Sequence, residues 1–167
     1  MSDEEKGSKG EITMTKDEIL EHNKNYILWL DTLLELREEQ AVSPYLPGKW
    51  SPNEIVMHLA EWDKFSSEKR LPYMKPGARL EGFPEFEQFN SEAAGRANKH
   101  SFKETVEYAK AERVRLIEKL EQLGEEEWDN EFFIGEHSLS IKKYFTGFIA
   151  HDKHHKQQIE SICENRD

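Results

Sequence analysis

The apolar residues of this chain recur at spacings of three and four in four stretches, which is the pattern of amphipathic helices. The first stretch opens with Thr15-Lys16-Asp17-Glu18, a capping box in which the threonine hydroxyl and the glutamate side chain each satisfy a backbone N–H. Its apolar positions predict a helix that runs to about Glu39, ahead of the breaks at Pro44, Pro47 and Gly48.

A second capping box, Ser51-Pro52-Asn53-Glu54, predicts the start of the next helix, with proline at the first helical position. His58 stands three residues after Ile55 and four before Trp62. These spacings place His58 on the apolar stripe of the helix, which we expect to face the core. The helix should end before Pro72.

Residues 70–100 are interrupted by prolines and glycines, and a short helix is expected from Pro84 to about Asn98. A third capping box, at Ser101 and Glu104, begins a helix that should end at Gly124, where glycine suits the position after the C-terminus. Residues 125–139 are expected to form an extended loop that could include a short strand pair. The last helix should be capped by Ser138 or Ser140, and its expected inner stripe is Tyr144, Phe148, His151, His155, Ile159 and Ile162.

Four long amphipathic helices without strong strands predict an all-α fold, a four-helix bundle with a long crossover between helices 2 and 3. Residues 13–167 are expected to form this single domain, and residues 1–12 a disordered N-terminal tail. No stretch has the length and apolar character of a signal peptide or a membrane span, so a cytoplasmic protein is expected.

The chain is acidic, with 23 basic and 34 acidic side chains and a net charge of −11. Lysine and arginine are interspersed with glutamate, so we expect neither nucleic acid nor an anionic membrane as a partner. Cys163 is the only cysteine, which excludes an internal disulfide. Without a basic cluster to lower its pKa, Cys163 is interpreted as a bystander thiol rather than a nucleophile.

Three histidines carry the most specific chemical signal. His151 and His155 are four residues apart, which on a helix brings their Cβ atoms to about 5–6 Å. Imidazole nitrogens at such a separation can share one metal ion at about 2.0–2.1 Å. His58, on the inward stripe of the second helix, is the candidate third ligand. Each histidine alone is better explained as an ordinary core or surface residue, but three on inward stripes of two helices favour a metal site.

One other histidine and three acidic residues are alternatives or additions to this ligand set. His154 lies three residues from His151 and competes with His155, although the spacing of four aligns better with Phe148 and Ile159. Asp152, Glu54 and Glu61 could orient the imidazoles, but solvated helix-face charges are the simpler interpretation. The remaining histidines are assigned to the surface: His22, His100 and His137.

Two segments carry a family resemblance. Trp50-Ser51-Pro52-Asn53-Glu54-Ile55-Val56-Met57-His58-Leu59 resembles the W-S-x-x-E-x-x-x-H-L motif of DinB-like four-helix bundle proteins. His151-Asp152-Lys153-His154-His155-Lys156-Gln157-Gln158-Ile159 is similar to that family's H-x-x-H-H-x-x-Q-I motif. Phe89-Asn90-Ser91-Glu92-Ala93-Ala94 and the Ser101–Glu104 box resemble the segment that joins the two halves in one branch. Lys156-Gln157 departs from the small residue or glycine often found before the glutamine, which leaves the subfamily and the substrate open.

The resemblance implies a homodimeric bundle with a divalent metal (zinc, nickel, iron or manganese) on three histidines, which match His58, His151 and His155. It also implies a metal-dependent enzyme of the thiol-dependent S-transferase, isomerase or hydrolase type. Such an enzyme would act on a small-molecule substrate, in some members with a low-molecular-weight thiol such as mycothiol or bacillithiol. The alternative is a non-catalytic, stress-related bundle whose metal is structural or which acts by protein interaction. A structural site is closed by four ligands, whereas this sequence offers three.

Overall fold

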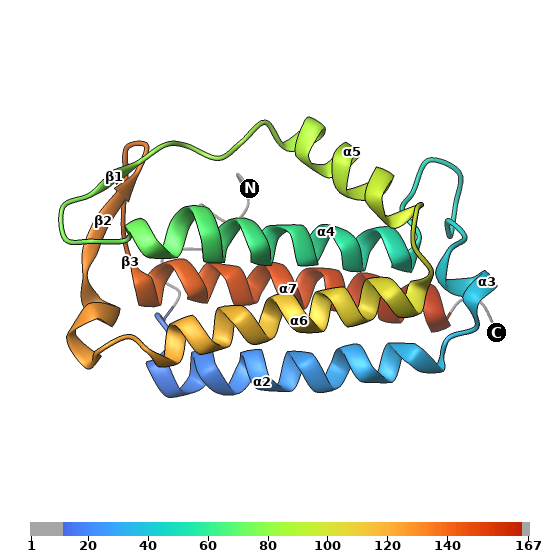
Figure 1. The fold of residues 1–167 in the computed structure, drawn as a ribbon, viewed down its shortest axis with the longest axis horizontal. Helices are drawn as coiled ribbons and strands as arrows, with labels where there is room; N and C mark the ends of the chain where they lie inside the picture. Colours follow the sequence, from blue (N-terminus) through green and yellow to red (C-terminus); the bar gives the residue numbers. More distant parts are fainter. Residues whose placement is uncertain (1–11, 165–167) are drawn as a thin grey trace.

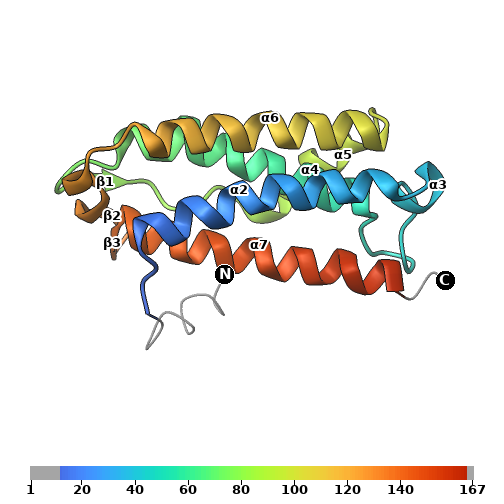
Figure 2. The ribbon, with the colours of Figure 1, turned by 90° about the horizontal axis from the view of Figure 1, so that it is seen from below.

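Four long helices run side by side along the molecule (Figure 1). The structure is a computed structural model, and it describes residues 12–164. The four helices are α2 (Lys16–Thr32), α4 (Pro52–Phe65), α6 (Phe102–Glu121) and α7 (Ile141–Glu164). α4 contacts both α6 and α7, and α2 contacts the same two helices, as Figure 2 shows from a second side. The predicted four-helix bundle is therefore confirmed, while the expected N-terminal tail lies almost entirely outside the described residues.

Capping boxes begin three of the four long helices, as the sequence predicts. In each, a hydroxyl accepts from the backbone N–H three residues later, and the glutamate there accepts from the backbone N–H of the capping residue. The pairs are Thr15 with Glu18, Ser51 with Glu54, and Ser101 with Glu104. Ser140 precedes the first residue of α7, and its hydroxyl accepts from the backbone N–H of Lys143 at 3.1 Å.

One predicted helix end and one predicted helix cap are wrong. The first helix stops at Thr32 and not near Glu39: a 3₁₀ turn (Leu33–Glu35) follows, and the short helix α3 (Glu38–Ala41) then turns away from the bundle. Apolar side chains continue past Thr32 because this corner also packs on the core, so periodicity alone did not reveal the break. Gly124 has a φ of −70° and begins a 3₁₀ turn (Glu125–Asp129), so it is no left-handed helix cap.

A long crossover joins α4 to α6 and passes over one side of the bundle (Figure 1). α4 continues into a single π-helical turn (Ser66–Arg70) and a 3₁₀ turn (Leu71–Tyr73). The crossover then forms the short strand β1 (Arg79–Leu80) and the helix α5 (Phe86–Ala97), which packs on α4. The predicted crossover and its short helix are confirmed.

A small sheet closes one end of the bundle. β2 (Glu131–Ile134) pairs antiparallel with β3 (His137–Ser140) through a turn in which Gly135 has a φ of +59°. β1 pairs in parallel with β2, which ties the crossover to the connection between α6 and α7. The strand pair follows the prediction, whereas β1 was not expected because two residues leave no periodic signal.

The apolar core is divided into clusters between the helices. Near α3 it contains one buried residue or more from each long helix, including Leu30, Leu59, Val106 and Ile159. Near the sheet it contains Ile19, Leu116, Trp128, Phe132 and Phe145. Among the helices of residues 12–164, none combines the length with the apolar character that a membrane crossing requires.

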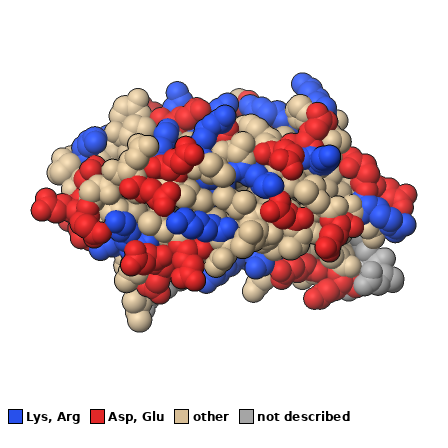
Figure 3. Space-filling model, turned by 60° about the horizontal axis from the view of Figure 1, so that its bottom comes forward, with Lys and Arg blue, Asp and Glu red and all other residues tan. Residues whose placement is uncertain are grey.

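Charged side chains of both signs alternate on the molecular face shown in Figure 3. This arrangement fits surface pairs between neighbouring helices, such as Lys24 with Glu121 and Lys110 with Asp31. The expectation that nucleic acid is not a partner stays a prediction, as does the expected homodimer.

Candidate metal centre

α4 places His58 inside the bundle. The residue is 4% exposed, and its ring lies 5.1 Å from that of Trp50 and 6.3 Å from that of Trp62. The capping box at Ser51 fixes the start of α4, so the second turn of the helix presents His58 to α7 rather than to solvent.

α7 supplies the other two imidazoles. His151 is half-buried and His155 is 9% exposed, and their ring centroids lie 4.6 Å apart. The ring of His58 lies 5.4 Å from that of His151 and 4.9 Å from that of His155. One ligand atom from each of the three residues falls within 4.8 Å of the other two. The fold thus brings together the three histidines that the sequence singles out.

The separation of the nitrogens fits a shared metal ion. The Nε2 atoms of His58 and His151 are 3.4 Å apart. Imidazoles bound at about 2.0–2.1 Å in tetrahedral geometry hold their nitrogens about 3.3–3.4 Å apart. A hydrogen bond between the two imidazoles also fits this distance, but it does not explain why His155 points to the same place.

Burial keeps these imidazoles neutral. It lowers the pKa of His58 from 6.5 to about 2, helped by the proximity of His155 and His151. Burial, together with His155, lowers the pKa of His151 to about 4. The pKa of His155 is also lowered, again chiefly by burial. A neutral imidazole has a free lone pair, so at pH 7 all three side chains are in the form that binds a metal.

Neighbouring side chains orient two of the rings. His155 Nδ1 lies 2.9 Å from Gln158 Oε1, so an N–H at Nδ1 donates to this oxygen and leaves Nε2 free. His58 Nδ1 is buried without a hydrogen-bond partner among the described residues. The side chain of Asn90 on α5 lies nearby and acts to raise the pKa of His58, against the effect of burial. Asn90 Oδ1 likewise has no hydrogen-bond partner among the described residues.

The chain matches the DinB superfamily over residues 23–159. It belongs to the DinB superfamily. The fold of this DinB protein is similar to that of YfiT from Bacillus subtilis, with a TM-score of 0.75 and 14% sequence identity over 93% of this chain and 90% of that one. YfiT is described as a probable metal-dependent hydrolase with an unusual four-helix bundle topology. No curated protein matches the sequence well enough to count as a relative.

His154, the sequence competitor of His155, points elsewhere in this DinB protein. It is exposed, and it is not part of the cluster of converging ligand atoms. His154 lies beside His155 with a ring separation of 5.0 Å, but on the solvent side of α7.

Replacing His154 with alanine should leave metal binding unchanged. Because the side chain is exposed and outside the cluster, we expect the variant to bind one metal per chain with an affinity within about twofold of wild type. Loss of a residue that orients a ligand would lower the affinity by about 10–100-fold. Titration of the metal-free variant with Zn²⁺ against a competing chelator measures this. A large loss of affinity would place His154, and not its neighbour, among the ligands.

An arginine between two aspartates lies beside the three histidines, and no pattern in the sequence predicted it. Arg113 on α6 is fully buried, donates from Nε and Nη2 to Asp63, and donates from Nη1 and Nη2 to Asp152 at distances of 2.7–3.0 Å. Asp152 directly follows His151, so this network anchors α7 at the level of the candidate ligands. An arginine within an amphipathic pattern normally indicates a solvated face, which is why it was missed.

The two aspartates share one arginine, and burial acts on the pKa of both. Burial raises the pKa of Asp63 to about 7, despite Arg113. Burial acts the same way on Asp152, but Arg113 and the hydrogen bond from His22 outweigh it and hold its pKa at about 2. His22 Nε2 lies 3.0 Å from Asp152 Oδ2, so His22, expected on the surface, is half-buried and part of this network.

The acidic residues considered as partners of the imidazoles have other roles. Asp152 is buried and not solvated, and the imidazole it contacts is that of His22. Glu54 caps α4. Glu61 accepts from the Tyr108 hydroxyl at 3.1 Å and pairs with Arg96 of α5. His100 and His137 are exposed, as expected.

Proposed function

We propose that His58, His151 and His155 bind one divalent metal ion and that this DinB protein is a metal-dependent enzyme acting on a small molecule. The observation that carries the proposal is the convergence of three neutral imidazoles from two helices, with ligand atoms within 4.8 Å of one another. The zinc, nickel, iron and manganese ions named for the family all accept imidazole nitrogen, so the donor set does not choose among them.

Three ligands leave a coordination position for chemistry. Structural zinc sites are closed by four protein ligands, whereas catalytic sites keep one position for water or substrate. Among residues 12–164, no fourth histidine, cysteine or carboxylate joins the cluster. The open position argues for catalysis over the alternative of a purely structural metal in a non-catalytic bundle.

The residues around the cluster prepare it for this role. A divalent metal held there would supply a Lewis acid that lowers the pKa of water or of a thiol. Gln158 holds the proton of His155 on Nδ1 and so directs Nε2 toward the shared point. Trp50 and Trp62 flank His58 and limit the access of bulk water from its side of the bundle.

Water and a low-molecular-weight thiol are the two candidate nucleophiles. The likeness to YfiT favours hydrolysis, since YfiT is described as a probable metal-dependent hydrolase. Transfer to a thiol such as mycothiol or bacillithiol is the second candidate, and it rests on the family resemblance alone.

Assays of metal-free and metal-loaded protein test the proposal. We expect hydrolysis of activated esters or amides by protein loaded with zinc, nickel, iron or manganese, and a fall to background after chelation. A parallel assay with a thiol and a generic electrophile separates thiol transfer from hydrolysis. Stoichiometric metal with neither activity across these panels would favour the non-catalytic bundle, and absence of bound metal would contradict the proposal as a whole.

A further inference from the structure

Arg70 is buried, and among the described residues no carboxylate is in hydrogen-bond contact with it, although the charge of Glu81 acts on it from farther away. It ends the π-helical turn after α4 and is 2% exposed. Its Nη1 donates to the backbone oxygen of Glu81 at 2.6 Å, but its Nε and Nη2 have no hydrogen-bond partner among the described residues. Buried charged groups are normally paired, because desolvation of an unpaired one costs free energy.

Arg113, the other buried arginine, has the carboxylate contact that Arg70 lacks. Arg113 uses its Nε and Nη2 to grip both oxygens of Asp63, the bidentate geometry in which two parallel N–H bonds match a carboxylate. The corresponding Nε and Nη2 atoms of Arg70 donate to no acceptor among the described residues. Both buried arginines thus present the same pair of donors, and only that of Arg113 is occupied by a carboxylate.

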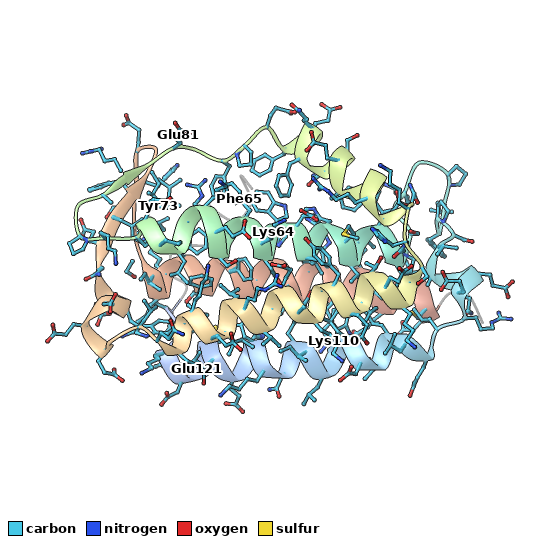
Figure 4. All side chains as sticks on the ribbon, viewed as in Figure 1. Lys64, Phe65, Tyr73, Glu81, Lys110 and Glu121 are labelled. Carbon is cyan, nitrogen blue, oxygen red and sulfur yellow. The ribbon has the colours of Figure 1, made fainter. Side chains whose placement is uncertain are left out.

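Aromatic rings enclose the guanidinium of Arg70. Its carbon atom lies 5.1 Å from the centre of the Phe65 ring and 5.0 Å from that of the Phe83 ring. In Figure 4, Phe65 lies between α4 and the crossover segment that carries Glu81. The rings hold the guanidinium by cation–π contacts and supply no hydrogen-bond acceptor to its free edge.

A run of rings leads from Arg70 toward the histidines. Trp62 lies 5.5 Å from Phe65 and 6.2 Å from Phe83, and the ring of His58 lies 6.3 Å from Trp62. Phe86 and Phe89 of α5 also pack on Trp62, at 5.8 and 4.5 Å. Along an ideal helix, the rise from His58 to Arg70 is about 18 Å. The contact of the guanidinium with Phe65, which precedes Arg70 in the chain, places it on the side of Arg70 that faces this run of rings.

We propose that the free edge of Arg70 binds the carboxylate of an organic acid whose apolar or aromatic body packs along these rings. That this acid is the substrate rests on the proposed function, since the acid would extend toward the three histidines. That it binds at Arg70 does not depend on the proposed function. A planar carboxylate matches the two donors, and a single guanidinium between phenyl rings suits a monoanion better than a doubly charged phosphate.

Entry of the acid requires the crossover to move. Nε and Nη2 of Arg70 are sealed from solvent, and Phe83 forms one wall. Residues 81–85 have no regular structure, and Glu81, Gly82 and Phe83 are exposed. Displacement of Phe83 therefore opens the edge without disturbing the four long helices.

An NMR titration of the full chain, freed of metal by chelation, tests the proposal. Phenylacetate should shift the backbone amide signals of Gly82 and Phe83 saturably, and its neutral analogue phenylacetamide should not. Arg70→Lys keeps the charge but loses the two-pronged edge, so binding should weaken at least about tenfold. Arg79→Lys is the matched control and should bind as wild type does, because Arg79 is exposed and stacks on Phe133 in the same region.

Four outcomes would overturn the proposal: no saturable shift in wild type, equal binding by phenylacetamide, unchanged binding by Arg70→Lys, or preference for phenylphosphonate. The last would assign the edge to phosphate-type ligands. The amide spectrum of each variant shows whether it is folded, and the ligand series in wild type decides the question if Arg70→Lys is not. Because the protein is metal-free, failure of the proposed metal function leaves this result intact.

Discussion

Replacing His58 with alanine will lower the affinity for a divalent metal by more than about 100-fold. Loss of a residue that merely orients a ligand costs about 10–100-fold, and loss of one of three ligands costs more. Among the three candidate ligands, His58 is the one on α4, so without it the pair on α7 would bind as two imidazoles of one helix. Competition between the metal-free protein and a chromophoric chelator measures the affinity.

Comparison with the other histidines makes this result specific. His151→Ala and His155→Ala should lose affinity to a similar extent, because each removes one of the three converging nitrogens. Circular dichroism shows whether each variant keeps its helices. A folded His58→Ala protein with wild-type affinity would contradict the assignment of His58.

Replacing Arg113 with methionine will destabilise the metal-free protein by about 3–5 kcal/mol, the usual cost of breaking a buried ion pair from one side. Asp63 and Asp152 are 1% and 2% exposed, and without Arg113 they are left as two buried carboxylates without a cation between them. Urea denaturation, with the free energy of unfolding extrapolated to water, measures the loss.

Lys110 on the same helix provides a matched control. It pairs with Asp31 at 2.6 Å, but both side chains are partly exposed to solvent, at 26% and 46%. Replacing Lys110 with methionine should therefore change the free energy of unfolding by less than about 1 kcal/mol. Equal effects of the two replacements would show that the buried network contributes no more than a surface pair.

The helix starts could be predicted because their signals are local. Each capping box depends on residues three positions apart, and all three form as expected. The end of the first helix could not be predicted, since Leu33, Leu34 and Leu36 extend the apolar pattern through a corner where the chain turns. The pairing of β1 with β2 joins residues far apart in the sequence and had no local signal.

The same distinction applies to the site. His58, His151 and His155 stand on the inward stripes of their helices, so periodicity was enough to predict that they would meet. Arg113 and Asp152 are also buried, but each looks like a solvated charge until its partner is known. The inner face of α7 is correspondingly shifted toward Phe145, Ile149 and Asp152 from the stripe predicted through Tyr144 and Phe148. A buried polar residue can be recognised only with its partner, and these partners lie on other helices.

We propose that three histidines, and no other side chain, hold one metal ion. The decisive test is diffraction data collected at the zinc absorption edge from crystals of the protein loaded with Zn²⁺. We predict one anomalous peak between His58, His151 and His155, about 2.0–2.1 Å from a nitrogen of each. A peak elsewhere, no peak, or a fourth protein ligand on the metal would contradict it.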